Sequence, residues 1–135
     1  MAEPLPLVVV DRCPVARMDR GIAMRIAVVG VCASGKTTIV RALRQAGYDA
    51  YVVAQEHSII PDLWRRSRPD HVVVLEANLE TIRQRRGPAW PEWLYRTQCD
   101  RLADARANAT VTIDTGALTV DETVRAILAA IESRE

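Results

Sequence analysis

The sequence predicts an α/β protein, namely a three-layer α/β/α domain built on a short parallel sheet of about four to five strands. From Arg25 onwards, short apolar runs alternate with longer segments of helical period, as they do in successive strand-helix-strand units. The apolar runs are nearly continuous, which is typical of strands buried on both faces of a parallel sheet. With 135 residues and 49% hydrophobic side chains, the chain is long enough to form one domain with a buried core.

The first 23 residues contain Pro4, Pro6 and Pro14 and show no sustained period. We expect them to form a loosely attached extension, followed by the domain proper at residues 24–135. Met24 directly precedes the first predicted strand and is one candidate for the native start. The alternative is a short extra strand at residues 7–10 that packs on an edge of the sheet.

The domain begins with an apolar run at residues 25–30, which predicts the first strand. A helix is predicted over residues 36–46, because Gly47 directly after it suits the left-handed turn that often ends a helix. The apolar residues on one side of this helix are Ile39, Val40 and Leu43. Such a one-sided pattern indicates a helix that packs against the sheet.

The middle of the domain contains two further short apolar runs, residues 50–55 and 71–76, which predict the second and third strands. A short amphipathic helix is expected between them at residues 60–66, where the spacing favours a core position for Trp64 over an exposed stacking position. Another short helix is expected at residues 79–86, directly after the third strand.

The last third of the chain is predicted to form a helix over residues 91–107, a fourth strand at 110–114 and a final helix over 118–134. The first of these helices begins at a proline, which is common at the first helical position. Thr119 and Glu122 have the spacing of a capping box at the start of the final helix. Its apolar stripe consists of Val120, Val124, Ile127, Leu128 and Ile131.

A glycine-rich stretch, GVCASGKT at residues 30–37, satisfies the pattern GxxxxGK[ST] between the first predicted strand and the first predicted helix. Such glycines permit a tight turn in which successive backbone N–H groups face inward at the positive end of the helix. The pattern therefore predicts a phosphate-binding loop. The residues expected to contact the phosphates are Gly30, Ala33, Ser34, Gly35, Lys36, Thr37 and Thr38.

Lys36, inside this loop, is the only lysine in the chain, and every other one of the 18 basic residues is arginine. An ammonium on a flexible stem can reach between the β and γ phosphates as a compact charge, whereas a guanidinium is larger and prefers a fork-shaped geometry. The next residue, Thr37, offers its hydroxyl to Mg²⁺. This combination predicts binding of a nucleoside triphosphate with Mg²⁺, and we expect ATP.

Residues 25–131 resemble the P-loop small-molecule kinases, the group that contains nucleoside monophosphate, shikimate and adenylylsulfate kinases. The loop carries most of the resemblance. The order of VVVLEANLETIRQRRG, the segment with Trp90 and Trp93, and TIDTGALTVDE adds to it. The resemblance implies the P-loop NTPase fold, a short lid at about residues 83–96, and an adenine site near the loop that follows the last strand.

The resemblance also implies a lid arginine that contacts the transferred phosphoryl group, where a guanidinium can stabilise the charge of the transition state. Arg83 and Arg86 are our main candidates because they lie three residues apart on one helical face, and Arg85 is a lesser candidate. For Trp90 and Trp93, packing of the lid against the body is favoured over a hinged lid with an apolar underside.

Glu56 directly follows the second predicted strand, at the edge of the sheet where the glycine-rich loop also lies. We expect it to hold a water bound to Mg²⁺ or to accept the proton of an acceptor hydroxyl, and the residues do not separate these roles. A glutamate that simply faces solvent is the alternative. Glu76 and Asp114 also end strands and are second choices for an acidic site residue.

The sequence departs from the kinase group in two ways: one strand-helix unit that often binds the acceptor is missing, and no paired aspartate motif is present. An NKxD motif is also missing, which favours an adenine site or a tolerant base site over a regulatory GTPase. We therefore expect a kinase that transfers the γ-phosphoryl group of ATP to a small-molecule acceptor. The alternative is a nucleotide-binding module or slow ATPase that controls a protein partner.

The composition bears on partners and location. A net charge of +1 gives no electrostatic sign of a nucleic-acid partner, and the apolar run at residues 5–10 is too short to span a membrane. The three cysteines form no CxxC pair and show no metal-ligand spacing with the two histidines, and Cys32 is expected to be a small filler residue in the loop. We expect a cytoplasmic protein with reduced thiols.

Overall fold

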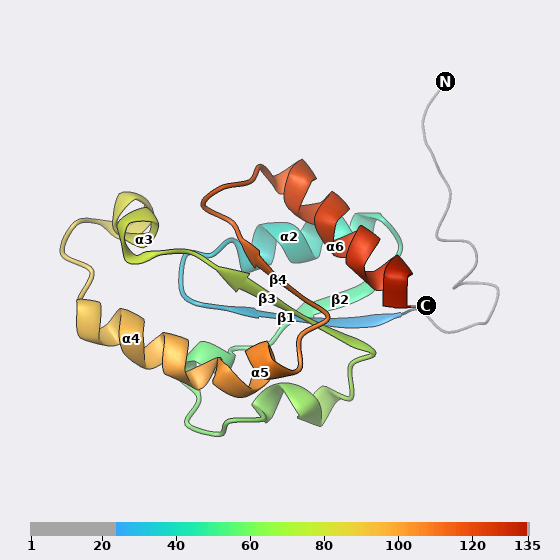
Figure 1. Cartoon of the computed structure of the whole chain (residues 1–135), viewed down its shortest axis with the longest axis horizontal. Helices are drawn as coiled ribbons and strands as arrows, with labels where there is room; N and C mark the ends of the chain where they lie inside the picture. Colours follow the sequence, from blue (N-terminus) through green and yellow to red (C-terminus); the bar gives the residue numbers. More distant parts are fainter. Residues whose placement is uncertain (1–23, 135) are drawn as a thin grey trace.

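The computed structural model describes residues 24–134, which fold around one four-stranded parallel sheet (Figure 1). The strand order is β2-β1-β3-β4. The strands are β1 (Arg25–Gly30), β2 (Asp49–Val52), β3 (His71–Glu76) and β4 (Val111–Asp114). The sequence prediction of an α/β protein with a short parallel sheet is thereby confirmed.

The strands are in a register that brings their carboxyl ends to one edge of the sheet. Gly30 at the end of β1 pairs with Leu75 of β3, and Glu76 at the end of β3 pairs with Asp114 of β4. On the other side of β1, Val28 pairs with Val52 at the end of β2. The loops that follow all four strands therefore start from the same edge, which is where ligands bind in open parallel sheets.

Helices lie on both faces of the sheet, an arrangement compatible with a three-layer α/β/α fold (Figure 1). The helices α2 (Lys36–Gln45) and α6 (Val120–Arg134) cover one face. The helices α4 (Glu92–Arg101) and α5 (Ala103–Ala107) lie across the other face, and α3 (Leu79–Arg86) follows β3 beyond the carboxyl edge.

Alternate residues of the central strand β1 fill two separate cores. Ile26 and Val28 pack with residues of α2 and α6, whereas Ala27 and Val29 pack with residues of α4 and α5 and with Leu102, which lies between these two helices. All four strand residues are fully buried, which explains why the sequence shows a continuous apolar run instead of an alternating one.

The second strand is shorter than predicted, because it ends at Val52 and not at residue 55. Gln55 instead begins a 3-10 turn (Gln55–His57), and its fully buried side-chain amide makes two hydrogen bonds with backbone groups further along the chain. Its Nε2 donates to the carbonyl of Ile60, and its Oε1 accepts from the backbone N–H of Trp64. These two bonds fix the chain after β2 as a compact turn.

Two predicted helices also differ in form. The segment predicted as a helix over 60–66 is a 3-10 helix (Leu63–Ser67) that ends where Arg68 adopts a left-handed conformation. The segment predicted over 91–107 is broken at Leu102, whose backbone N–H donates to the carbonyl of Cys99 in a 3-10 geometry. The buried Leu102 side chain occupies the core at this bend.

The boundaries of β1, β3 and α3 are as predicted, and the remaining boundaries differ from the predictions by one or two residues. Helix α2 ends at Gln45 and α6 begins at Val120, preceded by the predicted capping box: Thr119 accepts from the backbone N–H of Glu122, whose carboxylate accepts from the N–H of Thr119. The possible strand at residues 7–10 lies outside the described residues. Within residues 24–134, no helix is long and apolar enough to cross a membrane.

Candidate functional site

The loop between β1 and α2 follows a path that only some residue types permit. Gly35 has a φ of 94° and Ala33 a φ of 64°, both in the left-handed region. At Gly30 the constraint is space, because a Cβ there would lie 2.5 Å from the Ser34 hydroxyl and 2.6 Å from the Leu75 carbonyl. The two glycines of the sequence motif are thus required, one by close packing and the other by backbone conformation.

The amino end of α2 presents backbone N–H groups toward this loop. The first helical hydrogen bond runs from the N–H of Ile39 to the carbonyl of Gly35, so the N–H groups of residues 36–38 have no acceptor within the helix. No side chain of the described residues caps this end. The Ser34 hydroxyl is buried and has no hydrogen-bond partner within residues 24–134. An anion is the group that such an end accommodates best.

Lys36 folds back over the loop, and its ammonium group makes three hydrogen bonds. Nζ lies 2.8 Å from the carbonyl of Gly30, 3.1 Å from the carbonyl of Val31 and 2.8 Å from Oε2 of Glu56. An ammonium has three donors, so these three acceptors satisfy it fully. The two carbonyls place the positive charge above the loop, and the carboxylate holds it there.

Glu56 is a buried carboxylate and not a solvated glutamate at the end of a strand. Its residue is 3% exposed, and it lies in the 3-10 turn after β2. Its second oxygen, Oε1, is buried without a hydrogen-bond partner among the described residues. The backbone is anchored as well, because Arg101 of α4 donates to the carbonyl of Glu56 at 3.2 Å. The fold therefore brings Lys36 and Glu56, 20 residues apart, into one buried ion pair.

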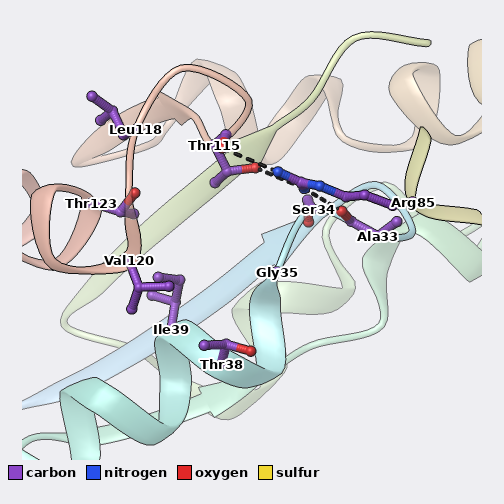
Figure 2. A pocket seen from close by; sticks show the side chains of 10 residues that line it. All are labelled: Ala33, Ser34, Gly35, Thr38, Ile39, Arg85, Thr115, Leu118, Val120 and Thr123. Carbon is purple, nitrogen blue, oxygen red and sulfur yellow. Dashed lines mark hydrogen bonds between the residues drawn. The ribbon is translucent and has the colours of Figure 1, made fainter. Parts of the chain in front are cut away.

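A cavity of about 320 Å³ adjoins the loop, between the start of α2 and the start of α6 (Figure 2). Its lining consists of Ala33, Ser34, Gly35, Thr38, Ile39, Arg85, Thr115, Leu118, Val120 and Thr123. Arg85 reaches across from α3 and donates to the carbonyl of Ala33 at 2.6 Å and to the carbonyl of Thr115 at 3.2 Å. One wall is apolar and another carries a guanidinium, which suits a flat aromatic group with polar edges.

Arg85, the lesser candidate among the lid arginines, is therefore the arginine of α3 that contacts the loop. Arg83 donates from Nε to the carbonyl of Trp90 at 3.0 Å, and the guanidinium of Arg86 lies 5.7 Å from the centre of the Trp90 ring. Both arginines thus contact Trp90, and their predicted contact with a phosphate stays a prediction. Thr37, by contrast, is exposed in the first turn of α2, and Thr38 lines the cavity.

Two of the three tryptophans pack in or against the core. Trp64 is 6% exposed in the core, as its helical spacing predicted, and its indole N–H donates to Asp104. Trp90 is partly buried and packs against the core that includes Ala27 and Val29, whereas Trp93 is 69% exposed and does not follow the expectation that it packs against the body. Trp90 thus follows the favoured expectation of packing against the body.

The carboxylates that were second choices face a different cavity, of about 180 Å³, lined in part by Glu76, Asp114 and Tyr95. Glu76 forms an ion pair at 2.6 Å with Arg106. Burial, followed by a hydrogen bond with the Cys99 thiol, raises the pKa of Tyr95 to about 12. This cavity shares Val31 with the loop but is built mainly from β3, β4 and α4.

Two site residues on α4 were missed by the sequence analysis. Gln98 is 1% exposed, and its Oε1 accepts from the backbone N–H of Cys32 at 3.0 Å. Arg101 contacts Glu56 as described above. Gln98 lies four residues before the buried Leu102, so a polar residue on the apolar side of this helix was the available signal.

We compared the chain with models of protein families, with curated proteins and with solved structures, and none of the three comparisons gave a match.

Proposed function

We propose that the protein binds ATP with the loop at residues 30–38 and transfers its γ-phosphoryl group to a small-molecule acceptor. The observation that carries this proposal is the buried pair of Lys36 and Glu56 beside an uncapped helix start. A cation for phosphate, free backbone donors and a carboxylate for the attacking group are the parts that phosphoryl transfer requires. Here they lie within one loop and the neighbouring turn.

Lys36 would keep its bonds to the carbonyls of Gly30 and Val31 and exchange Glu56 for a phosphate oxygen. The two carbonyls hold the ammonium in position, so that only its third N–H has to change its hydrogen-bond partner. Glu56 then loses its counter-charge at the moment when the phosphate arrives. Its carboxylate becomes available to the attacking hydroxyl.

The base of the nucleotide fits the cavity of about 320 Å³ next to the loop. Ile39 and Val120 offer apolar contact to one face of a planar base (Figure 2). Arg85 can lie against the other face, because its guanidinium is already held by the carbonyls of two lining residues, Ala33 and Thr115. Arg85 would thus contact the base, whereas the sequence analysis expected a lid arginine, Arg83 or Arg86, to contact the transferred phosphoryl group.

In the transfer step, the acceptor hydroxyl oxygen forms a bond to the γ-phosphorus, and the bond from that phosphorus to the β-γ bridging oxygen breaks to leave ADP. Glu56 accepts the hydroxyl proton. Thr37 and Glu56 offer the oxygen ligands that Mg²⁺ prefers, and the unpartnered Oε1 of Glu56 fits such a role. When bound, Mg²⁺ would neutralise charge on the phosphates.

A nucleotide-controlled switch with slow ATP hydrolysis is a second candidate, and one observation favours it. Helix α4 is joined to the site twice, by Gln98 to the loop and by Arg101 to the turn of Glu56. A nucleotide that shifts either contact would alter the position of α4, and with it a surface available to a protein partner. In this case Glu56 would orient water instead of an acceptor hydroxyl.

The first test is binding, measured by thermal denaturation with Mg²⁺ and a non-hydrolysable ATP analogue. At 100 times its dissociation constant a ligand adds about 2.7 kcal/mol, which corresponds to a rise in Tm of about 10 °C for a domain of this size. Lys36→Met should remove this rise, whereas Arg41→Met, an exposed residue of the same helix, should not. No rise in the unmodified chain with either ATP or GTP analogues would refute the proposal.

The second test separates the two candidates. ADP formation is measured with ATP and Mg²⁺ alone and then with a panel of nucleosides, sugars and small alcohols. Release that depends on one acceptor supports the kinase, and release that ignores all acceptors supports the switch. Glu56→Gln should lower either rate by about 100-fold or more with little loss of analogue binding, and unchanged turnover would remove Glu56 from the mechanism.

A further inference from the structure

Three metal-ligating side chains meet beside the loop, although the sequence spacing gave no sign of it. They are Cys32, Glu56 and His57, whose ligand atoms all lie within 4.8 Å of one another. Cys32 belongs to the loop after β1, and the other two belong to the 3-10 turn after β2. They come together because β1 and β2 are parallel neighbours, so that both following loops start from the same edge of the sheet.

Two of the three separations between the ligand atoms match a tetrahedral zinc site. His57 Nε2 lies 3.6 Å from Cys32 Sγ and 3.6 Å from Glu56 Oε2. With Zn–S of about 2.3 Å and Zn–N and Zn–O of about 2.0–2.2 Å, tetrahedral angles place the sulfur and nitrogen about 3.6 Å apart and the nitrogen and oxygen about 3.4 Å apart. Both observed separations agree with these values to within about 0.2 Å. The ligand atoms of Cys32 and Glu56 lie within 4.8 Å of each other, so all three side chains can reach one ion.

The donor types select the metal. A thiolate and an imidazole favour zinc, whereas Mg²⁺ favours oxygen ligands such as Thr37 and Glu56. Thiolate and carboxylate together carry two negative charges, which balance one Zn²⁺. The imidazole of His57 is 59% exposed, so the ion can reach the site from solvent and keep a water as its fourth ligand.

The sulfur is also held in place by a buried partner. Gln98 Nε2 lies 3.2 Å from Cys32 Sγ, while its Oε1 accepts from the backbone N–H of the same residue. Gln98 is 1% exposed, so this side-chain amide is fixed by the core. Donors to a ligating sulfur are a typical outer-shell feature of metal sites.

We propose that Cys32, His57 and Glu56 bind one zinc ion, and that this ion competes with Lys36 for Oε2 of Glu56. The thiol proton of Cys32 is released to solvent when the Zn–S bond forms. Because Oε2 also lies 2.8 Å from Lys36 Nζ, the zinc ion weakens that ion pair. The site therefore links zinc to the conformation of the lysine in the loop, and it does not require the chain to bind nucleotide.

The test uses the full untagged chain with Cys13→Ser and Cys99→Ser, so that Cys32 is the remaining thiol. Zinc is titrated against a chromophoric chelator, and folding is checked by circular dichroism. We expect one zinc ion per chain. Cys32→Ser and His57→Gln should each weaken binding by more than about 100-fold, since loss of even an outer-shell partner costs about 10–100-fold. His71→Gln is the matched histidine control and should leave the zinc affinity unchanged.

Cobalt reports the sulfur ligand directly. Co²⁺ bound to the same chain should show a sulfur-to-metal charge-transfer band that is absent from Cys32→Ser. Lys36→Met should tighten zinc binding, because the competing ammonium is gone. Zinc affinity that is equal in the background chain and in Cys32→Ser, or a cobalt spectrum without the band, would overturn the site. Unchanged or weaker zinc binding in Lys36→Met would overturn the competition. A failure of ATP binding would leave all of these outcomes unaffected.

Discussion

The buried ion pair of Lys36 and Glu56 can be tested by its energetic coupling. The two side chains are 11% and 4% exposed, and their charged atoms are 2.8 Å apart. With an effective dielectric constant of about 20, Coulomb attraction at this distance is about 6 kcal/mol, and loss of hydration offsets a large part of it. We expect a net coupling free energy of about 2 kcal/mol.

The four proteins of the cycle are the unmodified chain, Lys36→Met, Glu56→Gln and the double variant. Lys36→Met should lower the free energy of unfolding by about 3–5 kcal/mol, because it leaves a buried carboxylate without its cation. Glu56→Gln should cost about 1–3 kcal/mol, since two carbonyls still hold the ammonium. The double variant should lose about 2 kcal/mol less than the sum of these two effects.

Urea denaturation at low and high salt measures these differences. The exposed pair of Arg96 and Glu92 is the matched control, with a distance of 2.6 Å but side chains 74% and 55% exposed. Its coupling should be about 0.3–0.5 kcal/mol and should fall with salt, whereas that of the buried pair should persist. Additive effects at Lys36 and Glu56, to within about 0.5 kcal/mol, would show that the two charges do not interact as described.

Three further predictions follow from single contacts. Arg85→Ala should weaken binding of an ATP analogue about tenfold in calorimetry, a loss of about 1.4 kcal/mol, because Arg85 lines the cavity beside the loop. Arg86→Ala should not weaken it, and equal losses in the two variants would place the base elsewhere. Gly30→Ala should lower the free energy of unfolding by about 2 kcal/mol or more, since its Cβ would meet the Leu75 carbonyl at 2.6 Å, and an unchanged urea midpoint would contradict this packing. The free energy of unfolding should fall as pH rises from about 10 to about 12, because tyrosine in the unfolded chain loses its proton near pH 10, whereas burial and the Cys99 thiol raise the pKa of Tyr95 to about 12. In chemical denaturation, Tyr95→Phe should remove the part of this fall that is due to Tyr95. An identical pH profile in the variant would argue against this account.

The parts of the fold that depend on local patterns were predictable from the sequence. The strand at 25–30, the helix after the loop and the capping box of Thr119 and Glu122 each combine a short-range pattern with a characteristic terminal residue. The end of β2 and the break at Leu102 were not predicted. The end of the strand depends on the hydrogen bonds of the buried Gln55 side chain, and the break in the helix depends on the packing of Leu102 in the core.

The residues of the candidate site were predictable where they follow from the order of strands and loops, but not where they depend on how a helix is oriented in space. The position of Glu56 after a strand predicted that it would lie near Lys36, and the structure places them in contact. Contact of Arg83 or Arg86 with a phosphate stays a prediction, and the sequence spacing did not indicate that Arg85 is the arginine of α3 that contacts the loop. Which face turns toward the loop depends on how α3 is placed relative to β4, and a single sequence does not contain that information.

One amide of the loop is already in use. The backbone N–H of Cys32 donates to Gln98, a residue that the core holds immobile within α4. An anion that binds the N–H of Cys32 has to break its hydrogen bond to Gln98 of α4. An anion that leaves this bond intact is held by one backbone donor fewer. Hydrogen exchange along residues 92–101 would therefore distinguish two kinds of ligand. One binds at the start of α2 and leaves the protection of α4 unchanged, and the other breaks the contact with Gln98 and lowers that protection.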